Sequence, residues 1–281
     1  MRSVRLRLLT LALLPLVVLL PILLGVTMWR WIDKFDDLLI AKVASDLRIA
    51  EQYFGTIEAT QAVEIAALAQ SVEFADAKAQ GDAALRTLLS RVQDERGFDF
   101  LVYQSIENGP LPRVVRDVAA AAAPDTPSAG LAVLDAEALN LLGDDLAERA
   151  AIALVPTEAA RPIDRDVETR GMVILVANQE PGSDAVLIGG RLLNRNLDII
   201  DTMNTLIYRE RAEIDARTGT TTLFLDDVRI STNVRLFEGS RALGTRVSEV
   251  VFQQVMQDGV PWLDRAFVVN DWYVSGYVPL S

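Results

Sequence analysis

The feature that most constrains this chain is an uncharged run near its N-terminus, residues 8–29, with the sequence LLTLALLPLVVLLPILLGVTMW. At about 1.5 Å of rise per residue, a helix of this length extends ~33 Å, enough to cross a hydrocarbon core of about 30 Å. Pro15 and Pro21 lie within the run, and prolines are tolerated in lipid-embedded helices. We therefore predict a transmembrane helix over residues 8–29.

A cleaved signal peptide is the alternative interpretation of this run. Its apolar region would cover only about 7–15 residues and would end at a small-residue cleavage site. Here the run leads into Val-Thr-Met-Trp-Arg-Trp at 26–31, which lacks such a site and resembles an interfacial aromatic anchor. Three arginines and no acid precede the run, which favours a cytoplasmic tail at 1–7 and an extracytoplasmic body. We expect an uncleaved signal anchor.

The composition excludes several classes of function. The chain contains no cysteine and no histidine, so disulfides, thiolate nucleophiles, imidazole metal sites and Ser-His-Asp catalysis are all ruled out. A net charge of −12 argues against binding to a nucleic-acid backbone. The adjacent acids Asp144-Asp145 and Asp226-Asp227 could suggest acid–base chemistry or a metal, but we interpret them as structural residues of turns. We expect no enzymatic activity in this chain, no metal and no cofactor.

The rest of the sequence predicts an α+β protein with several parts in series. Apolar residues spaced by three or four predict an unbroken helix from about 31 to 79, a stalk at 30–80 that could pair with a second copy. We predict two small modules with antiparallel sheets, a membrane-distal one at 81–192 and a membrane-proximal one at 217–281. A connector helix at 193–216 joins them.

The individual elements follow from residue preferences and turn signals. In the distal module we predict strands at 98–103, 113–118, 151–155, 171–178 and 184–190, a loop at 119–130 and a helix at 136–149. In the proximal module we predict strands at 220–225, 228–234, 262–269 and 272–280, and a helix at 247–257. The sequence stops in or just after a strand, so we expect it to be part of a longer protein.

Four strings in the C-terminal third carry a family resemblance. GGRLLNRNLDIIDTMNTLIY, LFLDDVRISTNV, GSRALGTRVSEVV and PWLDRAFVVNDWYVSGYVPL follow one another in this order. Together they resemble the double Cache (PAS-like) extracellular sensor region of bacterial transmembrane receptors over 185–281. Over 30–184 the resemblance is architectural only.

The resemblance implies two PAS-like modules outside the cytoplasmic membrane, a homodimer, and a small-molecule ligand bound by the distal module. It also implies a second span and a cytoplasmic output such as a histidine kinase, a chemotaxis signalling domain or a diguanylate cyclase. Neither the second span nor the output is in the sequence, so the type of output stays open.

Candidate ligand-binding residues lie in the distal module. They combine aromatic side chains, which suit an apolar pocket, with arginines, whose guanidinium fork suits a carboxylate ligand. The predicted set is Phe98, Phe100, Tyr103, Arg113, Arg116 and Arg170. The alternative is that the aromatic residues belong to the core and the arginines offset nearby acids.

The proximal module has a polar and aromatic set of its own: Arg229, Thr232, Asn233, Arg235, Arg246, Trp262, Arg265, Trp272, Tyr273 and Tyr277. We expect this set mainly to build the core and transmit displacement, with direct ligand binding as the second interpretation. Trp272 and Tyr277 should face opposite sides of their strand.

The function predicted overall is ligand sensing by a transmembrane receptor. The alternative is a membrane-anchored periplasmic scaffold without a small ligand; an anchored hydrolase is disfavoured by the missing histidine and cysteine.

Overall fold

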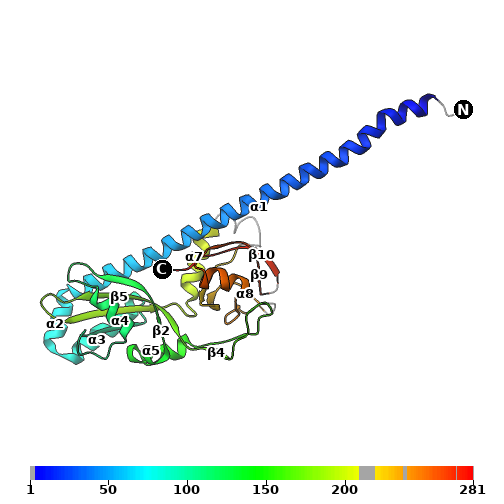
Figure 1. Ribbon diagram of the computed structural model, residues 1–281. Helices are drawn as coiled ribbons and strands as arrows, with labels where there is room; N and C mark the ends of the chain where they lie inside the picture. The colour runs from blue at the N-terminus through cyan, green and yellow to red at the C-terminus, as the bar shows by residue number, and fades with distance from the viewer. Residues whose placement is uncertain (1–3, 209–218, 237–238, 270, 281) are drawn as a thin grey trace.

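A computed structural model describes residues 4–208, 219–236, 239–269 and 271–280, with only some of the side chains among the first 37 residues. Helix α1 (Val4–Ala69) projects far beyond the body at its N-terminal end and runs along the body with its C-terminal half (Figure 1). The predicted span 8–29 falls in this projecting end, where many side chains lie outside the described ones. In the part of the chain that the structure describes, no helix combines the length and apolar character needed to cross a membrane.

The predicted stalk helix is interrupted before residue 79. Helix α1 ends at Ala69, and α2 (Val72–Gln80) begins after Ser71, whose side-chain oxygen accepts a hydrogen bond of 3.1 Å from the backbone N–H of Phe74. This N-cap satisfies a backbone donor that a new helix would otherwise leave unpaired. The prediction of one unbroken helix was therefore wrong at Ser71, although the segment is helical on both sides. The chain continues into α3 (Asp82–Arg96), which packs on α2.

A four-stranded antiparallel sheet forms the centre of the N-terminal part. Its strands are β1 (Phe100–Ser105), β2 (Ser128–Leu134), β5 (Gly171–Gln179) and β6 (Ala185–Leu192), in the order β1-β6-β5-β2. Residues 171–178 are all buried, because helices cover both faces of the sheet. On one face lie α1, α2 and α3, and on the other lie α4 (Arg113–Ala120), α5 (Ala136–Leu142) and α6 (Leu146–Ala150). The predicted combination of helices with antiparallel sheets is confirmed.

One predicted strand is wrong. Residues 113–118 form helix α4 rather than a strand, with Pro112 at its N-cap. Val115 and Ala119, four residues apart, are both fully buried against the sheet, which is the spacing of a helix face. The predicted loop 119–130 is shorter than expected, because Ser128 already belongs to β2.

The C-terminal part contains the elements predicted for it. They are α7 (Leu197–Tyr208), β7 (Thr222–Leu225), β8 (Val228–Thr232), α8 (Glu249–Phe252), the π-helix η1 (Gln253–Gln257), β9 (Trp262–Val268) and β10 (Asp271–Tyr277). Strands β7 and β8 form one antiparallel pair, and β9 and β10 form another. Residues 209–216 of the predicted connector, and Asn270 in the predicted last turn, lie outside the described residues.

The N-terminal and C-terminal parts share one of the hydrophobic cores. It contains Phe54 of α1, Ile174 of β5, Ile200 of α7 and Ile230 of β8, all of them buried. The segment that carries β3 (Ile152–Ala153) and β4 (Val167–Glu168) also runs beside residues 244–249. The two parts are therefore packed against each other as well as connected in sequence.

Candidate functional site

The three aromatic residues predicted to bind a ligand lie on opposite faces of the four-stranded sheet. Phe98 is buried with α1, α2 and α3, whereas Phe100 is buried on the other face, among α4, α5 and α6. Tyr103 packs on the same side as Phe98, where its ring meets Phe74 edge-on at 5.3 Å and its hydroxyl donates to Glu180. The three rings therefore stabilise two separate cores and do not line one site.

The three predicted arginines are also apart from one another. Arg113 and Arg116 are exposed on α4, and Arg116 donates a hydrogen bond of 3.2 Å to the carbonyl of Leu111. Arg170 lies just before β5, and its guanidinium donates two hydrogen bonds of 2.9 Å to the carboxylate of Glu168. The structure thus does not bring the six predicted residues together, and their role in ligand binding stays a prediction.

Arg170 belongs to an ion-pair network that links the two parts of the body. Its Nη2 lies 2.6 Å from Oδ2 of Asp226 in the β7–β8 turn, and Arg165 pairs with Glu168 at 2.8 Å. Burial alone would raise the pKa of Glu168, but the hydrogen bonds and charge of Arg170, with the charge of Arg165, outweigh it and lower that pKa. The hydrogen bonds to Glu168 raise the pKa of Arg170.

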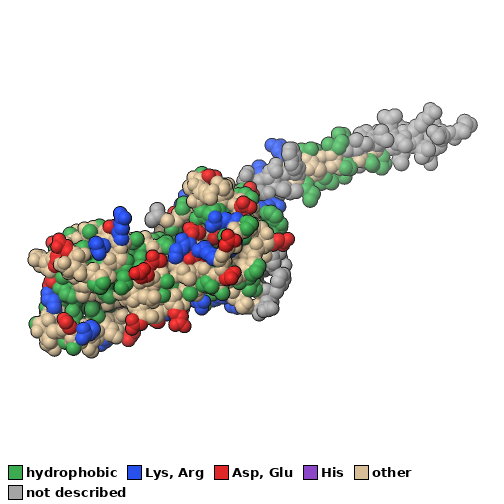
Figure 2. Space-filling view, turned by 60° about the horizontal axis from the view of Figure 1, so that its bottom comes forward, with side chains coloured by type: hydrophobic (Ala, Val, Ile, Leu, Met, Phe, Trp, Pro, Cys, Tyr) green, Lys and Arg blue, Asp and Glu red, His purple; other side chains and the backbone are tan. Residues whose placement is uncertain are grey.

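A second network lies beside the first and is more deeply buried. Asp227 is fully buried, and its Oδ2 accepts hydrogen bonds from Nε of Arg246 at 2.9 Å and from Nε of Arg161 at 3.2 Å. The adjacent carboxylates Asp226 and Asp227 therefore hold arginines of distant segments, which agrees with a structural role. Figure 2 shows acidic and basic side chains interspersed on the surface of the body.

Unlike these arginines, Arg229 on β8 has no acidic partner among the described residues. Its side chain is only 2 % exposed, and its Nη1 donates to the hydroxyl of Thr245. The guanidinium carbon lies 5.1 Å from the centroid of the Phe224 ring, a cation–π distance. Within the described part of the chain, no carboxylate pairs with Arg229, and its Nε has no hydrogen-bond acceptor.

Aromatic residues of the β9–β10 hairpin complete the surroundings of Arg229. The Tyr277 ring lies 5.7 Å from the Phe224 ring, and Tyr277 is the register partner of Trp262. The indole N–H of Trp262 is buried and has no acceptor among the described residues. Phe224, Trp262 and Tyr277 all pack on one hydrophobic cluster with α8 and η1. We call Phe224, Arg229, Thr245, Trp262 and Tyr277 the Arg229 cluster.

Burial also changes the protonation behaviour of this cluster. It lowers the pKa of Arg229 to about 10, which leaves the guanidinium charged at neutral pH. Burial raises the pKa of Tyr277, and the nearby charge of Arg229 and a hydrogen bond with Ser275 offset this only in part. The cluster therefore presents a positive charge and unused N–H donors among aromatic rings.

Sequence reasoning identified part of this cluster. Arg229, Trp262 and Tyr277 belong to the predicted proximal set, whereas Phe224 and Thr245 were missed. The signal for Phe224 is its alternation with the buried Leu223 and Leu225 on β7, which points it to the opposite face.

The other members of the proximal set have different positions. Arg246 lies in the Asp227 network, and Arg235, Arg265, Trp272 and Tyr273 are exposed. The Thr232 hydroxyl lies 2.6 Å from that of Thr222, and Asn233 accepts a hydrogen bond from the backbone of Thr221. Trp272 is 66 % exposed while Tyr277 packs on the core, so the prediction that they face opposite sides is confirmed.

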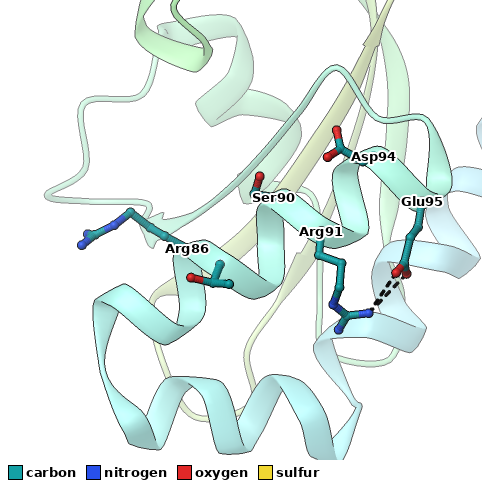
Figure 3. A pocket seen from close by; sticks show the side chains of 6 residues that line it. Arg86, Ser90, Arg91, Asp94 and Glu95 are labelled. Atoms are coloured by element: carbon teal, nitrogen blue, oxygen red, sulfur yellow. Dashed lines mark hydrogen bonds and ion pairs between the residues drawn. The ribbon is translucent and has the colours of Figure 1, made fainter.

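A shallow depression on α3 is a weaker candidate for a ligand site than the Arg229 cluster. Its lining comes entirely from one helix: Arg86, Thr87, Ser90, Arg91, Asp94 and Glu95 (Figure 3). Arg91 is already paired with Glu95 at 3.1 Å and with Glu73 of α2. This open and exposed surface offers no buried group to a ligand, so the Arg229 cluster is the better candidate.

Comparison with known proteins bears on the C-terminal part. No significant match was found among curated proteins. The family model of single Cache domain 3 matches residues 191–281, which run from the end of β6 to the end of the chain and include the whole Arg229 cluster. A double Cache region is not confirmed. The match confirms, for residues 191–281, the predicted resemblance to Cache sensor domains.

Proposed function

We propose that the chain is the extracytoplasmic ligand-sensing region of a transmembrane receptor, which binds a small molecule and relays a conformational change across the membrane. The observation that carries this proposal is that the Cache-matching part packs directly on α1. Gly276 of β10 lies against Val43 and Leu47, on the helix that leads to the apolar N-terminal run.

The anchor and its orientation rest on the sequence. The uncharged run at 8–29 is long enough to span a bilayer, and the arginines before it favour a cytoplasmic N-terminus. With this orientation the acidic body lies in the periplasm of a bacterial cell, attached to the inner membrane. The double arrangement of PAS-like modules, a homodimer formed along α1, and a cytoplasmic output beyond the sequence are further parts of the proposal.

The relay has a simple physical basis. A ligand can shift the balance between two packings of β10 on α1 only by the difference in its affinity for them. Since α1 is one helix from residue 4 to residue 69, a displacement at Val43 would be carried toward its N-terminal end. The Arg229 cluster includes Tyr277, the residue after Gly276, so a ligand there would act next to the contact with α1.

The absence of native cysteine allows a direct test by labelling of single cysteines. Asp125→Cys places a thiol on the exposed surface of the body, and Ser3→Cys places one before the apolar run. With the outer membrane of a bacterial host permeabilised, a membrane-impermeant maleimide should label position 125 in intact cells and position 3 only after lysis. Labelling of both positions only after lysis would contradict the proposal, as would release of the chain in soluble form.

A further inference from the structure

We propose that Arg229 binds the carboxylate of a small ligand, with the indole N–H of Trp262 as a second donor. The inference rests on the proposed sensing function and names the chemical class of its ligand. It also moves the binding site from the distal arginines predicted from sequence to the Cache-matching part.

Arg229 lacks a counter-charge among the described residues. Two arginines of the C-terminal part are among the buried residues, Arg246 and Arg229. Arg246 has the carboxylate of Asp227 within hydrogen-bond distance, whereas in the described part of the chain Arg229 has only a hydroxyl and a ring. Removing an ion from water is costly unless an opposite charge is close. An anionic ligand would supply the charge that Asp227 supplies to Arg246.

Arg229 and Trp262 also have N–H donors without an acceptor among the described residues. A guanidinium carries five N–H groups in a planar fork, which matches the two oxygens of a carboxylate. The Nε of Arg229 and the Nε1 of Trp262 are both buried and lack acceptors among the described residues. Buried donors are normally satisfied, so two of them in one cluster indicate an acceptor that is not part of the described chain.

The surroundings indicate what else the ligand carries. Phe224 and Tyr277 pack with the apolar residues of α8 and η1, and among the described residues Tyr277 is the only charge partner of Arg229. Apolar neighbours of this kind suit a small organic acid with an apolar body better than a strongly hydrated inorganic anion.

The test uses the full chain in detergent micelles and measures its melting temperature at constant ionic strength. The probes are acetate, propionate, benzoate and succinate, each compared with its amide. The proposal expects at least one acid to raise the melting temperature increasingly with concentration, as mass action requires, while the matching amide does not.

Variants assign the effect to a site. Arg229→Met removes the charge and keeps a long side chain, and it should abolish the shift without lowering the melting temperature of the unliganded chain. Arg229→Lys keeps the charge but loses the fork, and Trp262→Phe loses the N–H; each should weaken binding of the acid by about tenfold. Arg116→Met is the matched control from the distal set and should leave the shift intact.

Several outcomes would overturn the inference. One is a shift by the acids that survives Arg229→Met, and another is a shift lost in Arg116→Met, which would place the site on α4. A lowered melting temperature of unliganded Arg229→Met together with no response to any acid would show that the chain itself neutralises Arg229. Stabilisation by the amides alone would overturn the carboxylate site while leaving the sensing function in place.

Discussion

Gly276 of β10 lies directly against Val43 of α1. A Cβ atom at Gly276 would be 2.5 Å from Cγ1 of Val43 and 2.6 Å from Cδ1 of Leu47, closer than atoms can approach without moving. Glycine at this position therefore lets the β9–β10 hairpin sit close to the helix. Through this contact the part of the chain that matches the Cache family meets the helix that leads to the predicted membrane anchor.

Replacing this glycine should loosen the contact. Gly276→Ala is expected to lower the free energy of unfolding by about 1–3 kcal/mol, because the added methyl overpacks the interface with α1. Gly130→Ala on β2 is the matched control, since a Cβ there meets nothing within 4 Å. Denaturant unfolding of the three proteins measures the difference. Equal destabilisation by both substitutions would show that β10 does not pack on α1 as described.

The two adjacent carboxylates of the β7–β8 turn should differ sharply in importance. Asp227→Asn leaves Arg246 and Arg161 without their shared buried carboxylate and should cost about 3–5 kcal/mol. Asp226→Asn removes a partly exposed pair with Arg170 and should cost at most about 1 kcal/mol. Thermal unfolding checks both values, and a larger loss for Asp226→Asn would refute the assignment.

The close approach of residues 152–168 to the C-terminal part depends on Gly244. This residue has a φ of +77°, and a Cβ on it would overlap the carbonyl oxygen of Ala153. Gly244→Ala should therefore cost about 3 kcal/mol or more, from backbone strain and overlap together. Gly182→Ala is the control, because Gly182 has a φ of +72° but a Cβ on it would meet nothing within 4 Å. This substitution should lower the free energy of unfolding only through backbone strain, by about 1–2 kcal/mol. Equal losses of unfolding free energy in the two variants would contradict the close approach of Gly244 to Ala153.

The buried Glu168 predicts a dependence of stability on acid pH. Its pKa is lowered in the folded chain, so near pH 4 the folded state binds fewer protons than the unfolded state. Glu168 thus stabilises the fold above the ordinary glutamate pKa of about 4.3, and this contribution is lost as the pH falls below it.

Comparison with Glu168→Gln isolates this contribution. Asp201, whose pKa is lowered by its hydrogen bonds with Arg241, titrates in both proteins and cancels from the difference. The variant should be less stable than the natural chain at pH 7, and the gap in melting temperature should narrow between about pH 5 and pH 3. A gap that stays constant over this range would mean that Glu168 titrates like an exposed carboxylate.

Strands β5 and β6 could be predicted from sequence because their signals are local. The apolar run Met172–Ala177 is followed by a loop that contains Pro181 and Gly182, and the structure shows the hairpin that this pattern indicates. The segment 113–118 misled the prediction because its three valines favour strands in isolation. The segment is helical because the burial of Val115 and Ala119 against the sheet, a tertiary interaction, outweighs this local preference.

The candidate site was harder to predict because it depends on contacts between distant segments. Arg161 and Asp227 are 66 residues apart in sequence, and Arg170 and Asp226 are 56 residues apart. Sequence could therefore list arginines but could not tell which ones already have acidic partners. Arg170 was predicted to bind a ligand but is paired with Glu168 and Asp226, while the buried Arg229 has no carboxylate partner among the described residues.

The most direct test of the account follows the contact between Gly276 and Val43 during ligand binding. A Cβ atom at residue 276 would lie 2.5 Å from Cγ1 of Val43, which is bonded to the Cβ of that residue, so the double variant Val43→Cys and Gly276→Cys brings two thiols together in a chain with no other cysteine. The account predicts that mild oxidation forms this disulfide in the full chain, and that the acid giving the largest thermal shift changes its rate of formation. A disulfide that fails to form, or that forms at the same rate with and without the ligand, would contradict the claim that the Cache-matching part signals through α1.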